Sequence, residues 1–307
     1  MSKTALLFAG QGAQTVGMGK DLAAVLPAAR GWFDRANAVL GYDLAGICFN
    51  GPDAELTKTE NAQPGIFLVS WVAFEMLKER VAITFEAAAG LSLGEFTALT
   101  AAGVMSFEDG LRTVRQRGRF MQEACEVTQG GMAAIIGLDE AATRAVCAEA
   151  GVVLANLNCP GQLVISGESE RILQAVDLAK ARGARRAIPL PVAGAYHSPL
   201  MASAQPKLAA ELGKLALKAT QVPVISNVYA LPYGRPSQIG VGLVEQVTSS
   251  VRWEESMRCL LNQGFTRFIE LGPGTALTGF MKRINKDVQM LNVADLQSLE
   301  ATVTALV

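Results

Sequence analysis

The sequence is poor in histidine, in charge and in paired cysteines. Of its 307 residues, one is histidine, five are cysteine and 18% are charged. The single histidine, His197, excludes zinc and di-iron centres built from several histidines, and we expect neither a metal nor a cofactor. Scattered cysteines without a C-x-x-C pair favour reduced thiols over a disulfide framework, so we expect a cytoplasmic protein.

An excess of one charge and long apolar runs are also missing. Lys and Arg number 27 and Asp and Glu 28, which gives no electrostatic reason to expect a nucleic-acid partner. No apolar stretch reaches the roughly 20 residues that a membrane helix needs, so we expect no membrane partner. No basic segment precedes the apolar run from Ala5 to Gly10, and we expect no signal peptide. Nothing demands an oligomer, and we expect a monomer.

Apolar residues, in contrast, make up 50% of the chain. A chain of about 300 residues can bury roughly 75% of its unfolded surface, so a core forms without disulfide or metal. Short apolar runs that end in glycine, such as Ala5–Ala9 before Gly10, are typical of buried strands in an α/β sheet. We predict further strands at 85–89, 222–228 and 267–271, and helices at 32–40, 66–78, 95–102, 107–124, 200–212 and 241–249, with Pro64 at a helix start.

The pattern changes between residues 130 and 188. Strands are predicted at 132–136, 152–157, 162–166 and 185–188, helices at 139–149 and 168–182, and a turn at 158–161. This β-α-β-β-α-β order is the ferredoxin-like arrangement. We therefore predict a large α/β-hydrolase-like domain with a parallel sheet, residues 1–127 and 197–307, interrupted by a small ferredoxin-like domain, residues 128–196.

The segment Gly90-Leu91-Ser92-Leu93-Gly94 is a G-x-S-x-G motif between a predicted strand and a predicted helix. In that position a strained turn presents the serine hydroxyl, and the helix dipole favours an oxyanion nearby. Ser92 and Glu95 also fit a capping box, in which the serine caps the helix. The motif therefore predicts either a nucleophile or a capped turn.

A serine nucleophile needs a base, and His197 is the only imidazole in the chain. It lies in a loop bounded by Gly194 and Pro199, near the return to the large domain. A lone histidine is as readily a satisfied core or surface group. No acidic residue between Ser92 and His197 is marked out as its partner, and a backbone carbonyl could instead fix the imidazole tautomer.

The helix predicted at 107–124 carries four arginines. At 100° per residue Arg117 falls within the apolar arc, Arg115 at its edge, and Arg112 and Arg119 outside it. A buried arginine needs an anionic partner, because unpaired burial costs several kcal/mol. That partner is either an Asp or Glu of the protein or the carboxylate of a substrate.

Six segments make the chain resemble the malonyl-CoA:acyl carrier protein transacylase family, the acyltransferases of fatty-acid and polyketide synthesis. The resemblance covers essentially the whole chain and is specific because the segments occur together and in order. They are 8–14, 90–95, 117–122, 156–162, 194–198 and 270–274.

The resemblance implies a ping-pong reaction. His197 would take the proton of Ser92, which attacks the thioester of malonyl-CoA. After CoA leaves, malonyl-Ser92 would pass its acyl group to the phosphopantetheine thiol of acyl carrier protein. Arg117 would pair with the malonyl carboxylate throughout.

The resemblance also implies positions for the remaining site residues. The backbone N–H groups of Gln11 and Leu93 would form the oxyanion hole. Gln246 would orient His197 through its backbone carbonyl. The other substrate-binding residues that we expect are Asn158, at the edge of the cleft, Tyr196 and Met121.

Two positions depart from the family pattern. Leu91 stands where the family usually has histidine, and we expect it to pack rather than to act in the reaction; the alternative is altered acyl handling or hydrolysis. Tyr196 stands where malonyl-selective members often have phenylalanine. A similar ring should still crowd an α-methyl branch, which such contacts reject by only about 1–3 kcal/mol, so we keep malonyl as the expected acyl group.

Three alternative functions compete with malonyl transfer for fatty-acid biosynthesis. The chain could be an acyl hydrolase, an acyltransferase that serves a polyketide synthase in trans, or a scaffold that binds carrier protein without catalysis. A hydrolase for neutral acyl chains gains nothing from a buried arginine, and an intact set of Ser92, His197 and Arg117 disfavours a scaffold. A chain of this length without a fused partner domain favours fatty-acid biosynthesis.

Overall fold

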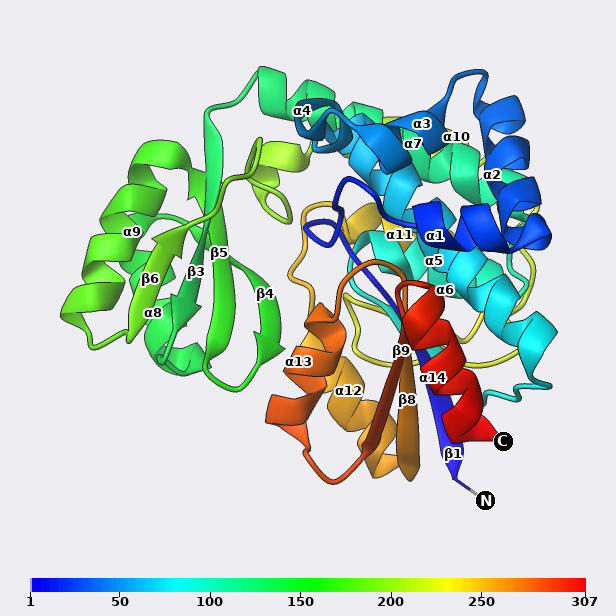
Figure 1. The fold of residues 1–307 in the computed structure, drawn as a ribbon. Coiled ribbons are helices and arrows are strands. Elements are labelled where there is room, and N and C mark those ends of the chain that lie inside the picture. Colours follow the sequence, from blue (N-terminus) through cyan, green and yellow to red (C-terminus); the bar gives the residue numbers. More distant parts are fainter. Residues whose placement is uncertain (1) are drawn as a thin grey trace.

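Two β-sheets organise the computed structural model, which describes residues 2–307 (Figure 1). The larger sheet is parallel and confirms the predicted α/β class. The smaller sheet is antiparallel. In spatial order the larger contains β7 (Val224–Ile225), β2 (Ala87–Gly90), β1 (Lys3–Phe8), β8 (Phe265–Leu271) and β9 (Gln289–Val293), and the smaller β4 (Val153–Cys159), β5 (Gln162–Glu168), β3 (Gly130–Ile136) and β6 (Arg186–Pro189).

The central strand β1 shows why the parallel sheet reads as a continuous apolar run. Leu6 and Phe8 face a core shared with α5 (Thr59–Arg80), α6 (Leu93–Ala101) and α7 (Phe107–Glu126). Ala5 and Leu7 face a second core with α12 (Trp253–Asn262) and α13 (Ala276–Ile284). Because both faces are covered, alternate residues of the strand are equally buried.

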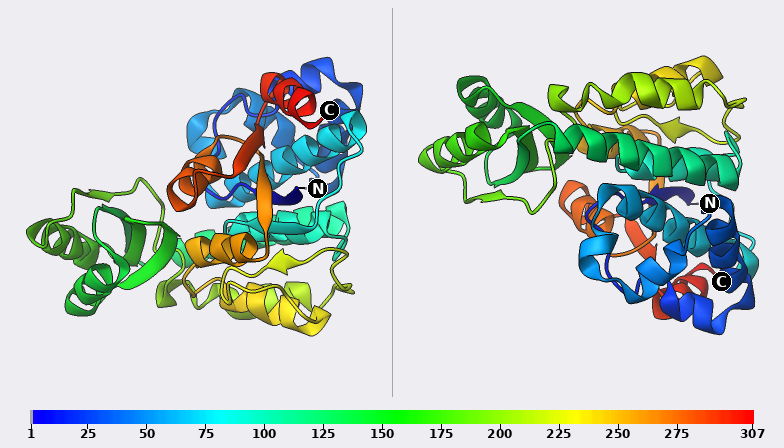
Figure 2. Two further views of the ribbon diagram at one scale, coloured as in Figure 1. Left: turned by 90° about the horizontal axis from the view of Figure 1, so that it is seen from below. Right: turned by 90° about the horizontal axis from the view of Figure 1, so that it is seen from above.

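The remaining helices surround the parallel sheet, and both termini lie in this part of the molecule (Figures 1 and 2). None of the helices within residues 2–307 is long and apolar enough to cross a membrane. The helices around the parallel sheet that have not yet been named are α1 (Lys20–Val25), α2 (Pro27–Leu40), α3 (Leu44–Asn50), α4 (Asp53–Leu56), α10 (Ala204–Leu212) after a short 3₁₀ turn (Pro199–Met201), α11 (Pro236–Glu245) and α14 (Leu296–Leu306).

The antiparallel sheet lies to one side and has its own core (Figure 2). Its helices α8 (Glu140–Ala150) and α9 (Ser169–Ala181) contribute to that core, and its strand order is that of a ferredoxin-like fold. Strand β4, at the sheet edge, is tied to the large part through Val251. The Val251 N–H donates to the Ala155 carbonyl at 2.8 Å, and the Leu157 N–H donates to the Val251 carbonyl at 2.9 Å. We keep 128–196 as the proposed extent of the small domain.

Several predicted element boundaries were wrong. Pro64 lies inside α5 rather than at its start. Its missing N–H costs one helical bond, but the turn before it is buried against α7 and held by that packing. Asn158 lies in β4, and only Pro160 and Gly161 form the turn.

Two further boundaries, those of β7 and α11, also differ from the prediction. Strand β7 has two residues rather than the seven predicted, because the chain turns at Asn227, whose side chain bonds to the end of β2. Helix α11 begins at Pro236, a favoured first helical residue, and ends at Glu245, so Gln246 follows the helix instead of lying within it.

The contact between α5 and α7 depends on Gly118. A Cβ built at Gly118 would lie 2.6 Å from the Thr59 carbonyl oxygen, a backbone atom that cannot turn away. Gly31, in the exposed part of α2, has nothing within 4 Å of the same position. The two helical glycines therefore differ in what an alanine side chain would meet.

We predict opposite effects of alanine at these two glycines. Alanine is favoured over glycine in a helix by up to about 1 kcal/mol, so Gly31→Ala should raise the free energy of unfolding. Gly118→Ala should lower it by about 1–3 kcal/mol, because α7 must move from α5. Urea denaturation of both variants measures the difference. A stabilised Gly118→Ala would contradict the close packing.

Candidate active site

The candidate site forms where neighbouring parallel strands end. Phe8 of β1 pairs with Gly90 of β2, so the residues that follow each strand emerge side by side. Gln11 follows β1 and Ser92 follows β2. Asn227 follows β7, the neighbour of β2. The carboxyl edge of a parallel sheet is where α/β proteins bind their ligands.

Ser92 occupies a strained turn between β2 and α6. Its φ of 52° is unusual for a residue with a side chain. The glycines of the motif are required by space: a Cβ at Gly94 would lie 2.2 Å from the Phe8 carbonyl oxygen, and one at Gly90 would lie 1.9 Å from the Gly94 carbonyl carbon. The G-x-S-x-G pattern therefore lets the turn pass against β1 with the serine projecting outward.

The predicted capping box was wrong. Ser92 makes no side-chain bond to the N-terminus of α6, and Glu95 turns inward, fully buried. The Ser92 hydroxyl instead lies 2.8 Å from His197 Nε2. The positive φ of Ser92 turns its side chain away from the helix that it precedes.

His197 is held in one tautomer. Its Nδ1 lies 2.8 Å from the Gln246 backbone carbonyl, which can only accept, so Nδ1 carries the proton. Nε2 is then free to accept from the Ser92 hydroxyl. Burial, together with the positive charge of Arg117, lowers the pKa of His197 from 6.5 to about 4, so the ring is neutral at pH 7.

Arg117 is buried beside this pair, as its place in the apolar arc predicts, whereas the side chains of Arg112 and Arg119 are more than half exposed. Its Nη2 donates to the Ser92 hydroxyl at 3.1 Å, and its Nη1 donates to Gln63 Oε1 at 2.7 Å. Burial lowers the pKa of Arg117 to about 10, which leaves it charged at pH 7.

No carboxylate among residues 2–307 forms an ion pair with Arg117 within 4.0 Å. Its Nε has no hydrogen-bond partner in the described part of the chain. The Phe96 ring lies 5.3 Å from its guanidinium carbon and partly offsets the loss of water. An incoming anion would therefore complete the surroundings of this cation.

Gln246 contacts both His197 and Arg117. Its backbone carbonyl accepts from His197, and its side-chain Oε1 accepts from Arg117 Nη2 at 2.9 Å. Its Nε2 donates to the Ser92 carbonyl at 2.9 Å and to the Glu95 carboxylate. Resemblance indicated only the backbone contact.

Sequence reasoning missed two residues that complete the site, Gln63 and Asn227. Gln63 bridges Arg117 and Gln11, donating to Gln11 Oε1 at 3.2 Å. Asn227 Oδ1 accepts from the Ser92 N–H at 2.6 Å. Both are ordinary polar residues in segments predicted as helix start and strand, and no local pattern distinguishes them.

The backbone N–H groups of Gln11 and Leu93 are available near Ser92. Within residues 2–307, neither Gln11 nor Leu93 donates a backbone hydrogen bond. Leu93 is the first residue of α6, where the helix dipole adds partial positive charge. Such a pair suits an oxygen that gains negative charge.

A cavity of about 730 Å³ opens over these groups. Residues from both sheets line it, and six of the nine predicted site residues are among them, whereas Arg117, Leu93 and Gln246 lie behind its wall. Asn158 reaches it from β4, and its buried Oδ1 has no partner within residues 2–307. The predicted residues on its wall are Gln11, Ser92, Met121, Asn158, Tyr196 and His197.

Tyr196 and Leu91, the two departures from the family pattern, lie on the cavity wall. The Tyr196 hydroxyl lies 2.5 Å from Thr59 Oγ1, which fixes the ring against α5. Burial raises the pKa of Tyr196 to about 12, so it remains a neutral wall. Leu91 also packs against the apolar cluster that contains Ala5.

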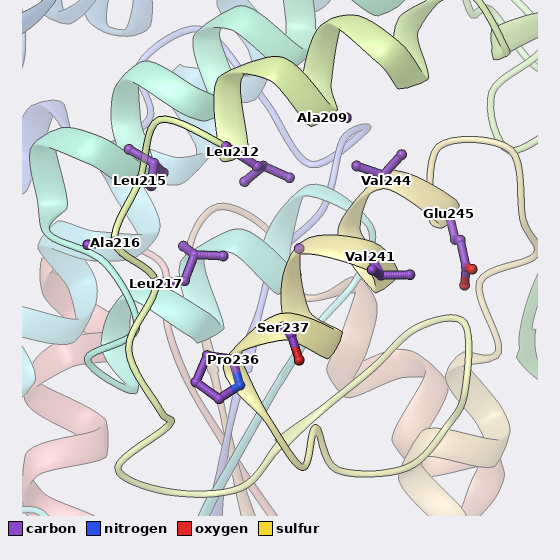
Figure 3. Close-up of a pocket in the computed structure, with 12 residues that line it drawn as sticks. Ala209, Leu212, Leu215, Ala216, Leu217, Pro236, Ser237, Val241, Val244 and Glu245 are labelled. Atoms are coloured by element: carbon purple, nitrogen blue, oxygen red, sulfur yellow. The ribbon is translucent and has the colours of Figure 1, made fainter.

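A second cavity, of about 650 Å³, lies between α10 and α11 (Figure 3). Leu212, Leu215 and Leu217 face Val241 and Val244 across it. Its one charged lining residue, Glu245, already accepts from the Tyr229 hydroxyl at 2.6 Å. This groove contains no reactive pair, so the cleft at Ser92 is the candidate active site.

Nowhere in residues 2–307 do three His, Cys, Asp or Glu side chains gather as a metal centre requires.

Comparison with known proteins decides the family. The family model described as "Acyl transferase domain" matches residues 5–300. The chain belongs to this acyl transferase family. It is 46% identical to a malonyl CoA-acyl carrier protein transacylase of Bacillus subtilis, with 100% of this chain and 98% of the relative covered.

Solved structures agree with this membership. The transacylase of the same name from Coxiella burnetii has a TM-score of 0.96 at 35% identity and covers 99% of this chain and 98% of its own. A malonyl-transacylase solved in complex with a type II polyketide synthase acyl-carrier protein also has a TM-score of 0.96, at 39% identity, with 99% and 100% covered.

The titration of His197 tests the surroundings of this acyl transferase site. Because burial and Arg117 both disfavour the imidazolium, we predict that the ring stays neutral as the pH falls through 6.5 and is protonated only near pH 4. With one histidine, ¹⁵N-histidine NMR gives one set of ring signals to follow. A midpoint near 6.5 in the folded protein would refute the buried, Arg117-adjacent environment.

Proposed function

We propose that this protein transfers the malonyl group from malonyl-CoA to the phosphopantetheine thiol of acyl carrier protein. Family membership supports acyl transfer, and the names of its relatives support malonyl as the acyl group. The observation that carries the proposal is the 3.1 Å contact between the Arg117 guanidinium and the Ser92 hydroxyl. A cation this close to a nucleophile suits an acyl group whose carboxylate is one methylene away from the reacting carbonyl.

In this proposal Arg117 selects and aligns the acyl group. The carboxylate of malonyl-CoA accepts hydrogen bonds from the guanidinium N–H groups of Arg117. One of these groups donates to the Ser92 hydroxyl before substrate binds. Charge-assisted bonds to a planar guanidinium fix both position and orientation. The thioester carbonyl carbon is thereby placed at Ser92 Oγ, with its oxygen toward the N–H groups of Gln11 and Leu93.

Acylation follows from the tautomer of His197. As Ser92 Oγ bonds to the thioester carbon, its proton passes to Nε2, and the Gln246 carbonyl stabilises the imidazolium through Nδ1–H. The carbonyl oxygen gains negative charge and is held by the two N–H groups. The carbon–sulfur bond then breaks, and CoA leaves as a thiol with the proton from Nε2.

Transfer runs the same steps with a different thiol. The phosphopantetheine thiol gives its proton to Nε2 and attacks the malonyl ester carbon. Ser92 Oγ leaves and recovers the proton, and malonyl-carrier is released. Asn158 and Met121 line the route by which either thioester reaches Ser92. We propose that the carrier is that of fatty-acid biosynthesis.

Tyr196 supports malonyl over branched acyl groups. Its hydroxyl contact with Thr59 holds the ring on the cavity wall beside His197. An α-methyl group would have to displace that ring, and one methyl group discriminates by roughly 1–3 kcal/mol in such pockets.

A transfer assay tests the function. We predict that malonyl-CoA and carrier protein give malonyl-carrier as the main product, and that brief exposure to malonyl-CoA alone leaves a malonyl adduct on Ser92, detected by mass spectrometry. Ser92→Ala should give neither. Predominant free malonate would identify a hydrolase. Carrier binding without an adduct would identify a scaffold. Faster transfer to a polyketide carrier than to a fatty-acid carrier would contradict the pathway proposed.

The anion contact is tested at Arg117. We predict that Arg117→Ala lowers kcat/KM for malonyl-CoA on the order of 100-fold, the size expected for losing charge-assisted bonds in a buried site. The rate with acetyl-CoA, which has no carboxylate, should fall far less or rise. Arg119→Ala, an exposed arginine on the same helix, is the matched control. Equal loss for both substrates would contradict the role of Arg117.

A further inference from the structure

Glu95 is the feature of the site that the proposed reaction does not use. Its side chain is fully buried, and it is the only titratable residue of α6. Its carboxylate accepts three hydrogen bonds: from Gln246 Nε2, from the Tyr233 hydroxyl at 2.6 Å and from the Asn227 N–H at 3.3 Å. It touches neither the Ser92 hydroxyl nor His197.

We propose that Glu95 is a positioning residue, whose carboxylate holds Gln246 and Asn227 so that they in turn hold His197 and Ser92. The inference rests on the proposed function, because positioning matters only if Ser92 and His197 react. It concerns the arrangement of the pair and not the identity of the acyl group.

The Gln246 amide carries the first half of the argument. Its oxygen faces the Arg117 cation and its nitrogen faces the Glu95 carboxyl group, so a cation at one end and an acceptor at the other fix which way it points. The same residue gives its backbone carbonyl to His197 Nδ1. Immobilising the side chain therefore also immobilises the carbonyl that sets the tautomer of the base.

Asn227 carries the second half. Its backbone N–H donates to Glu95, while its side chain accepts from the Ser92 N–H at 2.6 Å and donates to the Gly90 carbonyl at 2.8 Å. These two side-chain bonds flank the strained turn. A residue with φ of 52° keeps that conformation only where its surroundings hold it.

The surroundings of Glu95 determine how easily its carboxyl group ionises. Burial raises its pKa to about 7, against the opposing effects of its hydrogen bonds and of Arg117, so the group is mainly a carboxylate above pH 7. The other titratable groups that face it are tyrosines, Tyr233 and the more distant Tyr229, both with raised pKa values. An apolar residue here would be free of this desolvation cost but could accept none of the three hydrogen bonds.

Two substitutions test the charge and the length of the Glu95 side chain separately. Glu95→Gln keeps the shape but makes one terminal atom a donor, so it cannot accept from Tyr233 and Gln246 with both atoms. Glu95→Asp keeps the charge and withdraws it by one methylene. The matched control is Glu270→Gln, because Glu270 is the other buried carboxylate and lines the same cavity, but accepts from the N–H groups of Leu277 and Thr278 and makes no contact with Gln246.

The test measures Ser92 and His197 without any acyl substrate. A fluorophosphonate reports the reactivity of Ser92, and the ¹H–¹⁵N signal of the one imidazole reports its Nδ1–H bond. Displacing reacting groups by about 1 Å can cost on the order of 100-fold, so we expect labelling slower by about tenfold or more in both Glu95 variants, with a shifted Nδ1–H signal. Glu270→Gln should keep both within threefold and unshifted.

Urea denaturation accompanies each variant and identifies those that are folded. A folded Glu95 variant that labels within threefold of the unmodified protein would overturn the inference. Equal slowing in Glu270→Gln would overturn it as well, since the effect would then follow from any buried carboxylate. An unmodified protein that labels but transfers no malonyl group would contradict the proposed function and leave this comparison valid.

Discussion

The site depends on one amide held between a buried cation and a buried carboxyl group. Gln246 lies with its oxygen on Arg117 and its nitrogen on Glu95, and its main chain meets His197. Arg117 and Glu95 do not form an ion pair with each other, and both side chains are buried. A buried charge without a partner costs several kcal/mol, so the amide dipole that links them stabilises both groups.

The position of that amide follows from where strands end. Ser92, Gln11 and Asn227 come from three neighbouring parallel strands and meet at one edge because the strands run the same way. Glycine at 90 and 94 lets β2 turn sharply enough for the serine to project. Arg117 comes from α7, which approaches α5 closely because residue 118 is glycine. Backbone packing therefore brings these residues together, and the side-chain bonds of Gln246 and Asn227 then hold them in place.

The sequence predicted those parts that have a local pattern. The α/β class, the β-α-β-β-α-β order and the burial of Arg117 follow from periodicity, and the turn at Ser92 follows from its glycines. Glu95 was interpreted as a helix cap because spacing alone cannot show that Tyr233 and Gln246 lie across from it. Gln63 and Asn227 were missed for the same reason: their partners are far away in sequence and near only after folding.

The two walls of the cleft are joined by main-chain bonds between β4 and Val251. Such bonds do not depend on which side chains the residues carry. Side chains lining the cleft can therefore be exchanged, changing which acyl groups fit, while the walls stay at the same separation. The bonds that join the walls and the side chains that shape the space between them are therefore different groups, so a substitution in the cleft leaves those bonds in place.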